Sequence, residues 1–238
     1  MTYIQGFVAA VPTANRKVFV THAQKAMEGF HDHGLLHGAE CWGDDVPDGK
    51  LTSFPMSVKA QADETVVFAW YLWPSKEAHD AAMKDAMKDP RLNMETNPMP
   101  FDGKRVVYGG FEPVFELGSR QPGGYFDGFI CAVPKDGREA FRSFAAEVDP
   151  IFMEYGATWI MENWSVDIPE GTVTDFRRAV QAAPDEDVMF SWTQWPDKAA
   201  RDEGSRRMMQ DTRFSSDMQM PFDGKRMVIG GFAPLVEV

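Results

Sequence analysis

The sequence predicts an α+β protein in which one βαββαβ module occurs twice. Residues 6–12 (GFVAAVP) return as residues 128–134 (GFICAVP), an offset of 122 (128 − 6). Residues 100–105 (PFDGKR) return letter for letter as residues 221–226, an offset of 121 (221 − 100), so the second copy is one residue shorter between these landmarks. A period of this length far exceeds a solenoid unit, and each copy is therefore expected to be a small fold in its own right.

The first half of each module reads as a strand, a helix and a second strand. Residues 3–11 are rich in β-forming residues and end at Pro12. Apolar residues then recur at the spacing of one helical face and predict an amphipathic helix that ends near Gly34: Phe19, Ala23, Ala26, Met27 and Phe30. The second copy carries the same stripe at Phe141, Ala145, Val148 and Phe152. Residues 36–43 are expected to form the second strand.

The second half of each module reads as a strand, a helix and a last strand. A β-rich segment is expected from about Ser57 through Trp73. Its counterpart in the second copy alternates between an apolar and a polar face, with Val188, Phe190 and Trp192 on one side and Ser191 and Thr193 on the other. Ser75 stands at the N-cap position of the second helix, and a last strand follows an Asp-Gly turn.

This order of elements leaves one face of each sheet uncovered. A βαββαβ module forms an antiparallel sheet with both helices on the same side, and the other copy is the obvious cover for the opposite side. Residues 119–124 (SRQPGG) have the composition of a connecting segment. We therefore expect a first repeat over residues 1–118, a linker over 119–124 and a second repeat over 125–238, folded as one pseudo-symmetric unit.

Composition and charge argue against several classes of partner. The net charge is −12, and neither repeat has a basic patch that would attract nucleic acid. Cys41 and Cys131 lack the spacing of a zinc or disulfide framework. No charged leader precedes an apolar segment at the amino terminus, and no run of eighteen apolar residues occurs. We expect a cytoplasmic protein without a membrane span.

Three segments of the first copy carry a family resemblance: residues 40–50 (ECWGDDVPDGK), residues 73–76 (WPSK), and residues 99–105 ahead of the Gly-Gly-Phe at 109–111. They resemble the YbaA-like family of bacterial proteins, also described as domain of unknown function 1428. The resemblance extends over essentially the whole chain twice. It implies two ferredoxin-like repeats that form an intramolecular dimeric α/β barrel, with the two sheets facing each other across a shared interior. It supplies no reaction.

The two copies depart from the family pattern in different places. Residues 174–180 (TDFRRAV) look like the family form, whereas residues 52–58 (TSFPMSV) have lost the acidic and both basic residues. Conversely, the Asp44-Asp45 pair of the first copy has become Val166-Asp167 in the second. Two sites built on these loops would not be equivalent.

Glu40 and Glu162 are the candidate catalytic residues. Each shares a strand face with a tryptophan two residues later, Trp42 and Trp164 respectively. A carboxylate buried among aromatic side chains has a raised pKa and can act as a general acid or base. The alternative is a glutamate paired with an arginine or located at a sheet edge.

Further candidates for ligand binding are cations and aromatic walls. Lys76 and Lys198 fall in the first turn of a helix, where the helix dipole disfavours a cation, so acidic partners are expected among Asp44, Asp45 and Asp167. Arg105 and Arg226 suit a carboxylate clamp, with a structural salt bridge as the alternative. Trp73 and Trp195 are candidate walls of a pocket, with a core position as the alternative.

No cofactor and no metal site are expected. The five histidines all fall in the first copy, without metal-ligand spacing, and no nucleotide fingerprint or nucleophile elbow is found. The leading hypothesis is a cofactor-independent enzyme that acts on a small organic molecule in a cavity between the two sheets. The alternatives are a non-catalytic sensor of a small acidic metabolite and a structural or interaction module. The chain is expected to be a monomer that resembles a dimer, or a homodimer of such fused units.

Overall fold

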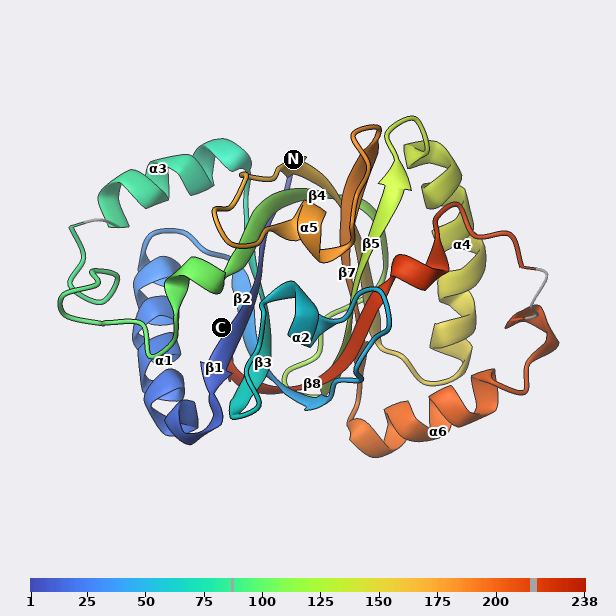
Figure 1. Ribbon diagram of the computed structural model, residues 1–238, viewed down its shortest axis with the longest axis horizontal. Helices are drawn as coiled ribbons and strands as arrows, with labels where there is room; N and C mark the ends of the chain where they lie inside the picture. The colour runs from blue at the N-terminus through green and yellow to red at the C-terminus, as the bar shows by residue number, and fades with distance from the viewer. Residues whose placement is uncertain (87, 215–217) are drawn as a thin grey trace.

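A closed barrel of eight antiparallel strands forms the centre of the molecule, and helices flank it on two opposite sides (Figure 1). The structure is a computed structural model and describes residues 1–86, 88–214 and 218–238. The first repeat supplies α1 and α3 on one side, and the second supplies α4 and α6 on the other (Figure 1). The order of strands around the barrel is β1-β3-β2-β8-β5-β7-β6-β4.

The first repeat has the predicted order of strands and helices. Its elements are β1 (Tyr3–Pro12), α1 (Arg16–Asp32), β2 (His37–Asp45), α2 (Phe54–Ser57), β3 (Glu64–Trp73), α3 (Lys76–Ala86) and β4 (Val107–Gly118). The helix α1 ends because Gly34 adopts a φ of +99°, which only glycine takes up readily.

The second repeat copies this order element by element. Its elements are β5 (Tyr125–Pro134), α4 (Arg138–Glu154), β6 (Trp159–Asp167), α5 (Phe176–Ala179), β7 (Glu186–Trp195), α6 (Lys198–Met208) and β8 (Val228–Glu237). The last strand of each repeat follows a short 3₁₀ turn, at Gly103–Arg105 and Gly224–Arg226.

Strand β3 begins later than predicted, at Glu64 instead of near Ser57. The helix α2 occupies Phe54–Ser57, because the Ser53 side chain caps its first turn and Pro55 stands at its start. The chain then turns at Lys59, which has a φ of +50°, and strand β3 begins only at Glu64.

The two repeats close the barrel by pairing their edge strands across the junction. Strand β2 pairs with β8, and β4 pairs with β6, in addition to the pairs within each repeat. Neither sheet therefore keeps a free edge, since closure leaves every strand with two neighbours. The predicted fold, two ferredoxin-like repeats that form one intramolecular α/β barrel, is confirmed.

Aromatic side chains of both repeats fill the interior of the barrel. Trp70 and Trp192 stack with their ring centroids 4.8 Å apart and an interplanar angle of 7°. Phe68 and Phe190 stack 4.7 Å apart. All four are fully buried. Gly6 completes the packing, because a Cβ atom there would lie 2.9 Å from the Phe190 ring. The uncovered faces of the two sheets therefore cover each other, as expected.

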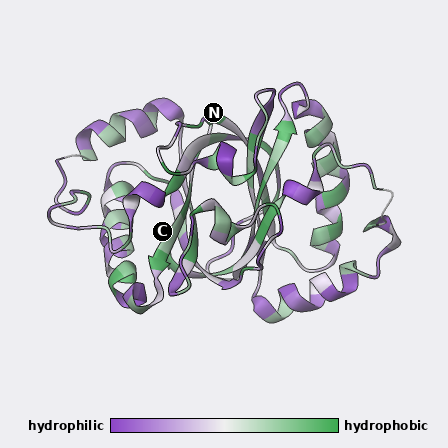
Figure 2. Cartoon of the chain, viewed as in Figure 1, coloured by the Kyte–Doolittle hydropathy of each residue, from purple (hydrophilic) through white to green (hydrophobic). Residues whose placement is uncertain are grey.

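The long helices α1 and α4 pack on the outer face of the barrel. Figure 2 shows that α1 and α4 carry alternating hydrophobic and hydrophilic stripes. The apolar stripe of α1 includes the buried residues Phe19, Ala23 and Met27, and that of α4 includes Phe141 and Ala145. No helix of the described residues is long and apolar enough to cross a membrane.

Candidate functional site

Glu40 and Glu162 lie on the outer face of the barrel, each in an apolar pocket between the sheet and the long helix of its own repeat. The pocket around Glu40, the first pocket, has a volume of about 250 Å³. It is lined by Gln5, Phe7, Ala9, Phe19, His22, Ala23, Ala26, Phe30, Glu40, Val67, Ala69, Tyr71, Met99, Phe101 and Val106. The pocket around Glu162, the second pocket, has a volume of about 170 Å³.

This position differs from the cavity that the sequence analysis expected between the two sheets. The barrel interior is occupied by stacked aromatic rings, because the apolar face of each strand points inward. The polar face of the alternating strand β7, with Ser191 and Thr193, lines the second pocket beneath α4 instead. The candidate carboxylates therefore belong to two separate pockets, one per repeat, and not to one shared chamber.

In the first pocket, Glu40 is held by a hydrogen bond from Tyr71. Glu40 on β2 lies directly opposite Ala69 on β3, and Gly38 lies opposite Tyr71, so Tyr71 is the diagonal neighbour of Glu40. The small Ala69 side chain leaves room for this contact, in which Tyr71 Oη donates to Glu40 Oε1 over 2.5 Å. Burial raises the pKa of Glu40 to about 7, and the hydrogen bond from Tyr71 opposes that rise. Glu40 therefore exchanges its proton near neutral pH.

His22 of α1 contributes a neutral ring to the first pocket. Its Nδ1 lies 3.0 Å from Oδ1 of Asn97. The amide of Asn97 is oriented by two donated bonds, to the backbone carbonyls of His22 (3.1 Å) and Arg91 (2.7 Å). Because an amide oxygen only accepts, Nδ1 carries the proton and Nε2 remains as an acceptor. Burial lowers the pKa of His22, which keeps the ring neutral.

The second pocket holds two carboxyl groups. Glu162 on β6 lies directly opposite Ser191 on β7, whose hydroxyl donates to Glu162 Oε2. Asp149 comes from α4, is 6% exposed, and its Oδ2 has no hydrogen-bond partner among the described residues. Burial raises the pKa of both groups, and the negative charge of Glu162 raises the pKa of Asp149 further. This pocket is lined mainly by aromatic residues and methionines.

The lysines and aspartates singled out in the sequence meet at the rim of the barrel, away from both pockets. Lys76 Nζ lies 3.2 Å from Asp167 Oδ2 of the other repeat. Lys198 Nζ lies 4.0 Å from Asp44 Oδ2, again across the junction. Asp45 pairs instead with Arg201, 2.6 Å away. Asp44 and Asp167 thus partner the lysines as expected, in half-exposed pairs that link the two repeats, whereas Asp45 does not.

Arg105 and Arg226 are engaged by carboxylates of their own repeat. Arg105 pairs with Glu64 at 2.6 Å and with Asp102 at 3.0 Å. Arg226 pairs with its Glu186 counterpart at 2.7 Å. The Arg226 guanidinium lowers the pKa of Glu186 to about 2. These contacts match a structural salt bridge, the alternative to a ligand clamp.

The four candidate tryptophans pack on the outer face but do not line either pocket. Trp42 packs against Phe19, and Trp164 Nε1 donates to Asp187. Trp195 Nε1 donates to Asp127 over 2.9 Å. Trp73 is fully buried and contacts Phe30, which does line the first pocket. Trp73 therefore supports the first pocket from behind.

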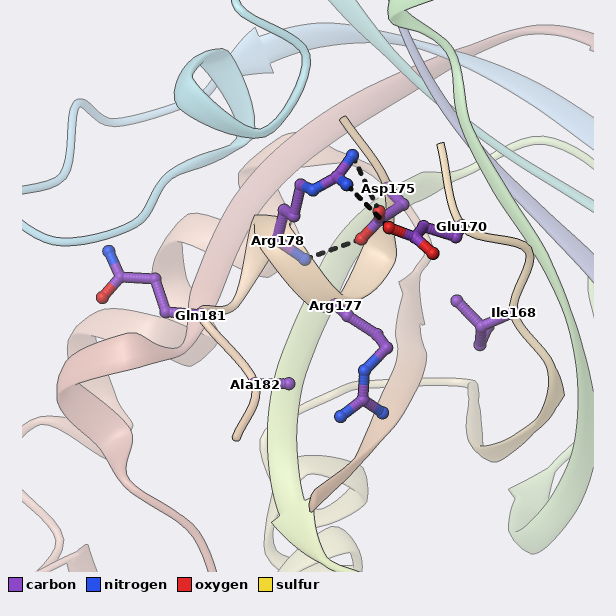
Figure 3. A pocket seen from close by; sticks show the side chains of 7 residues that line it. All are labelled: Ile168, Glu170, Asp175, Arg177, Arg178, Gln181 and Ala182. Atoms are coloured by element: carbon purple, nitrogen blue, oxygen red, sulfur yellow. Dashed lines mark hydrogen bonds and ion pairs between the residues drawn. The ribbon is translucent and has the colours of Figure 1, made fainter. Parts of the chain in front are cut away.

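The divergent loops of the two repeats form open surface pockets. In the second repeat, a pocket of about 610 Å³ is lined by Ile168, Glu170, Asp175, Arg177, Arg178, Gln181 and Ala182. Figure 3 shows Arg178 directed at Glu170 and Asp175, with Arg177 turned away from them. Arg178 pairs with Asp175 at 3.2 Å, and Arg177 donates to the backbone carbonyls of Ala183 and Glu186. Both arginines thus serve the local structure of the α5 loop.

Metal-binding geometry is not found around the histidines of the first repeat. Within residues 1–86, 88–214 and 218–238, no group of three or more His, Cys, Asp or Glu side chains converges on one point. His79 pairs with Asp80 and packs on Tyr3, and His33 lies 3.3 Å from Asp89.

Comparison with known proteins identifies the family. The model of the family "Protein of unknown function (DUF1428)" matches residues 2–103 and again residues 124–224. The chain belongs to the DUF1428 family. The uncharacterized protein YbaA of Escherichia coli strain K12 is 49% identical over 116 residues, which is 49% of this chain and 99% of YbaA. A YbaA of Shigella flexneri matches with the same figures. This DUF1428 chain therefore carries two matches to the family model, and about half of it is similar to the whole of YbaA.

Solved structures share the fold of this DUF1428 protein at low sequence identity. A Fusobacterium nucleatum protein provisionally named a monooxygenase has a TM-score of 0.59 and 11% identity, covering 99% of this chain and 93% of its own. An anthrone oxidase-like protein has a TM-score of 0.59 and 11% identity, covering 100% and 92%. At such identity the likeness shows the fold alone.

Two pocket residues of this DUF1428 protein, Tyr71 beside Glu40 and Asp149 in the pocket of Glu162, were not predicted from the sequence. Tyr71 was not singled out because it is a diagonal neighbour of Glu40, two residues beyond its direct partner. Asp149 was detectable in principle: it follows Phe141 by eight residues and Ala145 by four, so it falls on the apolar stripe of α4. A carboxylate in such a stripe is the signal that was overlooked.

Proposed function

We propose that the first pocket binds a small, largely apolar organic molecule and that Glu40 transfers a proton to or from it. The observation that carries this proposal is the Glu40 carboxyl group, which lines an apolar pocket and has a pKa of about 7. A group that titrates near neutral pH serves equally well as acid or base. Proton transfer of this kind needs only Glu40 and the substrate, in keeping with an enzyme that acts without a dissociable cofactor.

The surroundings of Glu40 support a proton transfer in a defined direction. As the carboxylate, Glu40 keeps Oε1 occupied by Tyr71 and has Oε2 available to take a proton from a substrate C–H or O–H bond. The Nε2 acceptor of His22 and the side-chain oxygen of Gln5, which has no partner among the described residues, offer hydrogen-bond acceptors to the same molecule. The apolar walls exclude water and so favour uptake of an aromatic or aliphatic body.

The names of structural neighbours agree with an activity on small organic molecules. One is an anthrone oxidase-like protein and another is provisionally named a monooxygenase. These neighbours share only the fold with this chain. Because a fold does not determine the reaction, their names add little weight to the proposal.

The alternative of an acidic-metabolite sensor receives less support from the contacts. Lys76 and Arg105, the cations expected to hold such a ligand, are each paired with two carboxylates. No contact described above favours a purely structural module over a ligand-binding one.

The test uses 5-nitrobenzisoxazole, a planar apolar probe with one acidic ring C–H bond. A base removes this proton, the electron pair breaks the N–O bond, and a coloured cyanonitrophenolate forms, so proton abstraction is read by absorbance. We expect a rate that rises with pH through a midpoint near 7. We also expect a loss of about 100-fold or more in Glu40→Gln.

The matched control is Glu64→Gln, which makes the same carboxyl-to-amide change in the Arg105 salt bridge outside the first pocket. It should leave the rate within about twofold of wild type. A rate that is unchanged in Glu40→Gln, or no rate above that of free acetate, would overturn the proposal.

A further inference from the structure

The second pocket differs from the first in the charges that it presents. Asp149 and Glu162 both line it, and none of its described lining residues is a lysine, an arginine or a histidine. The rest of the lining is mostly aromatic and sulfur-containing, including Phe144, Phe152 and Phe222. A pair of acids thus faces an apolar space, with no cation among its described lining residues to balance it.

Asp149 finds no hydrogen-bond partner for its Oδ2 among the residues that the structure describes. The residue is only 6% exposed, and Oδ2 accepts no hydrogen bond from the described residues. Glu162 makes no hydrogen bond to Asp149 Oδ2, and its own Oε2 is engaged by Ser191. An unpartnered buried carboxyl group destabilises the fold. Burial and the charge of Glu162 raise the pKa of Asp149, which is the response expected of an acid that lacks a cation.

The first repeat shows that the fold does not require an acid at this point of the helix. With the offset of 122 between the copies, Asp149 corresponds to Met27 (149 − 122), which is buried and apolar. The same offset places Phe144 where the first pocket has His22 (144 − 122). The second repeat has therefore exchanged an apolar residue for an acid and a basic ring for an aromatic one. Both changes favour a positively charged occupant.

We propose that the second pocket is a binding site for a small organic ammonium ion, a primary or secondary amine carried on a short aromatic or aliphatic body. The N–H groups would donate to Asp149 Oδ2 and to Glu162, which completes the hydrogen bonds that the protein leaves open. The surrounding phenylalanine rings attract a cation through their faces and cover the apolar body. A volume of about 170 Å³ restricts the ligand to a molecule smaller than most drug-sized ligands.

This proposal goes beyond proton transfer by Glu40 and does not depend on it. The two carboxyl groups lie in a different repeat and line a different pocket. It also accounts for the divergence of the copies: one chain would combine a site for a neutral or weakly acidic molecule with a site for a cation.

The test compares three probes of similar shape on the intact protein by isothermal titration calorimetry: 2-phenylethylamine, 2-phenylethanol and 3-phenylpropanoate. We expect the amine to bind at least about tenfold more tightly than the alcohol, and the carboxylate to bind more weakly still. Equal affinity for amine and alcohol, or no heat from the amine at about 10 mM, overturns the proposal.

Two variants of Asp149 and one control locate the site. Asp149→Asn keeps the shape and removes the charge, and Asp149→Met restores the residue found in the first repeat. Both are expected to weaken amine binding at least about tenfold while Glu40→Gln leaves it unchanged. A thermal melt verifies that each variant is folded. Amine affinity that survives in both Asp149 variants overturns the proposal.

A direct readout of position comes from methionine methyl signals in NMR spectra. Met220 and Met227 line the second pocket, and Met99 lines the first. The amine should shift the signals of Met220 and Met227 and leave that of Met99 in place. A shift confined to Met99 would show that the amine binds in the first pocket and would overturn the proposal.

Discussion

Tyr71 Oη donates a hydrogen bond of 2.5 Å to Oε1 of Glu40, from the diagonal position on the neighbouring strand. The corresponding contact in the second repeat is made by Ser191, which lies directly opposite Glu162. The two repeats thus hold equivalent glutamates with different hydroxyl groups. Removing the Tyr71 hydroxyl group should therefore change the pKa of Glu40 without changing that of Glu162.

Tyr71→Phe should raise the pKa of Glu40 above its value of about 7. The tyrosine hydroxyl stabilises the charged carboxylate, so its removal favours the protonated form, by about one pKa unit. A ¹³C NMR titration of the glutamate carboxyl groups measures the change. Ser191→Ala serves as the matched control, since it removes the hydroxyl from Glu162 and should leave Glu40 as in wild type. A pKa of Glu40 that falls in Tyr71→Phe would contradict the geometry.

Glu40→Gln should change the dependence of stability on pH. The pKa of Glu40 is raised from 4.5 to about 7 in the folded protein, so its contribution to stability is fully present below about pH 4.5 and is lost as pH rises to about 7. The glutamine does not ionise. We expect the free energy of unfolding of the variant, relative to wild type, to increase by roughly 3 kcal/mol between about pH 4 and pH 8. Urea unfolding at both pH values measures it, and a flat difference would rule out a buried ionising Glu40.

Glu186→Gln should have the opposite dependence on pH. The pKa of Glu186 is lowered to about 2 by Arg226, so its contribution is present above about pH 4.5 and disappears as pH falls through about 2. The variant should be less stable than wild type by roughly 1–3 kcal/mol at neutral pH, and by progressively less in acid. Glu139→Gln, in an exposed pair with Arg142, should cost less than about 0.5 kcal/mol under the same urea titration.

The two repeats produced as separate chains, residues 1–118 and 119–238, should assemble into one barrel when mixed. Each sheet alone exposes an aromatic face, with Trp70 on one side of the junction and Trp192 on the other. Burying these rings favours association. Analytical ultracentrifugation should report a heterodimer, and near-ultraviolet circular dichroism should recover the tryptophan signal of the intact chain. Two fragments that each stay folded as monomers would show that the junction is not needed.

Much of the fold was accessible from the chain because its causes are local. The repeat, the alternating strands and the stripe of Phe19, Ala23 and Met27 follow from side-chain spacing along a single element. The bare face of each sheet also follows, since element order alone decides on which side the helices lie. The predicted start of the third strand was too early: residues 54–57 form a short helix capped by Ser53, and strand β3 begins only at Glu64.

The candidate site was accessible only in part. Glu40 and Glu162 were predicted from their place beside tryptophans on a strand, a short-range pattern. The other polar residues of the pockets come from other elements, so spacing along the chain does not reveal them: Tyr71 donates to Glu40 across a strand pair, and Asp149 enters the second pocket from a helix. The location of the pockets also could not be predicted, because it depends on whether side chains fill the inside of the barrel or leave space on its outer face.

By itself, then, the sequence determined a duplicated βαββαβ module with two equivalent glutamates and a junction that must bury both sheets. Tertiary structure alone decided that stacked rings such as Trp70 and Trp192 fill the interior, so that room for a ligand remains beneath α1 and α4. The reason is physical: periodicity states which face of a strand is apolar, but whether that face leaves a cavity depends on how side chains from distant strands fit together.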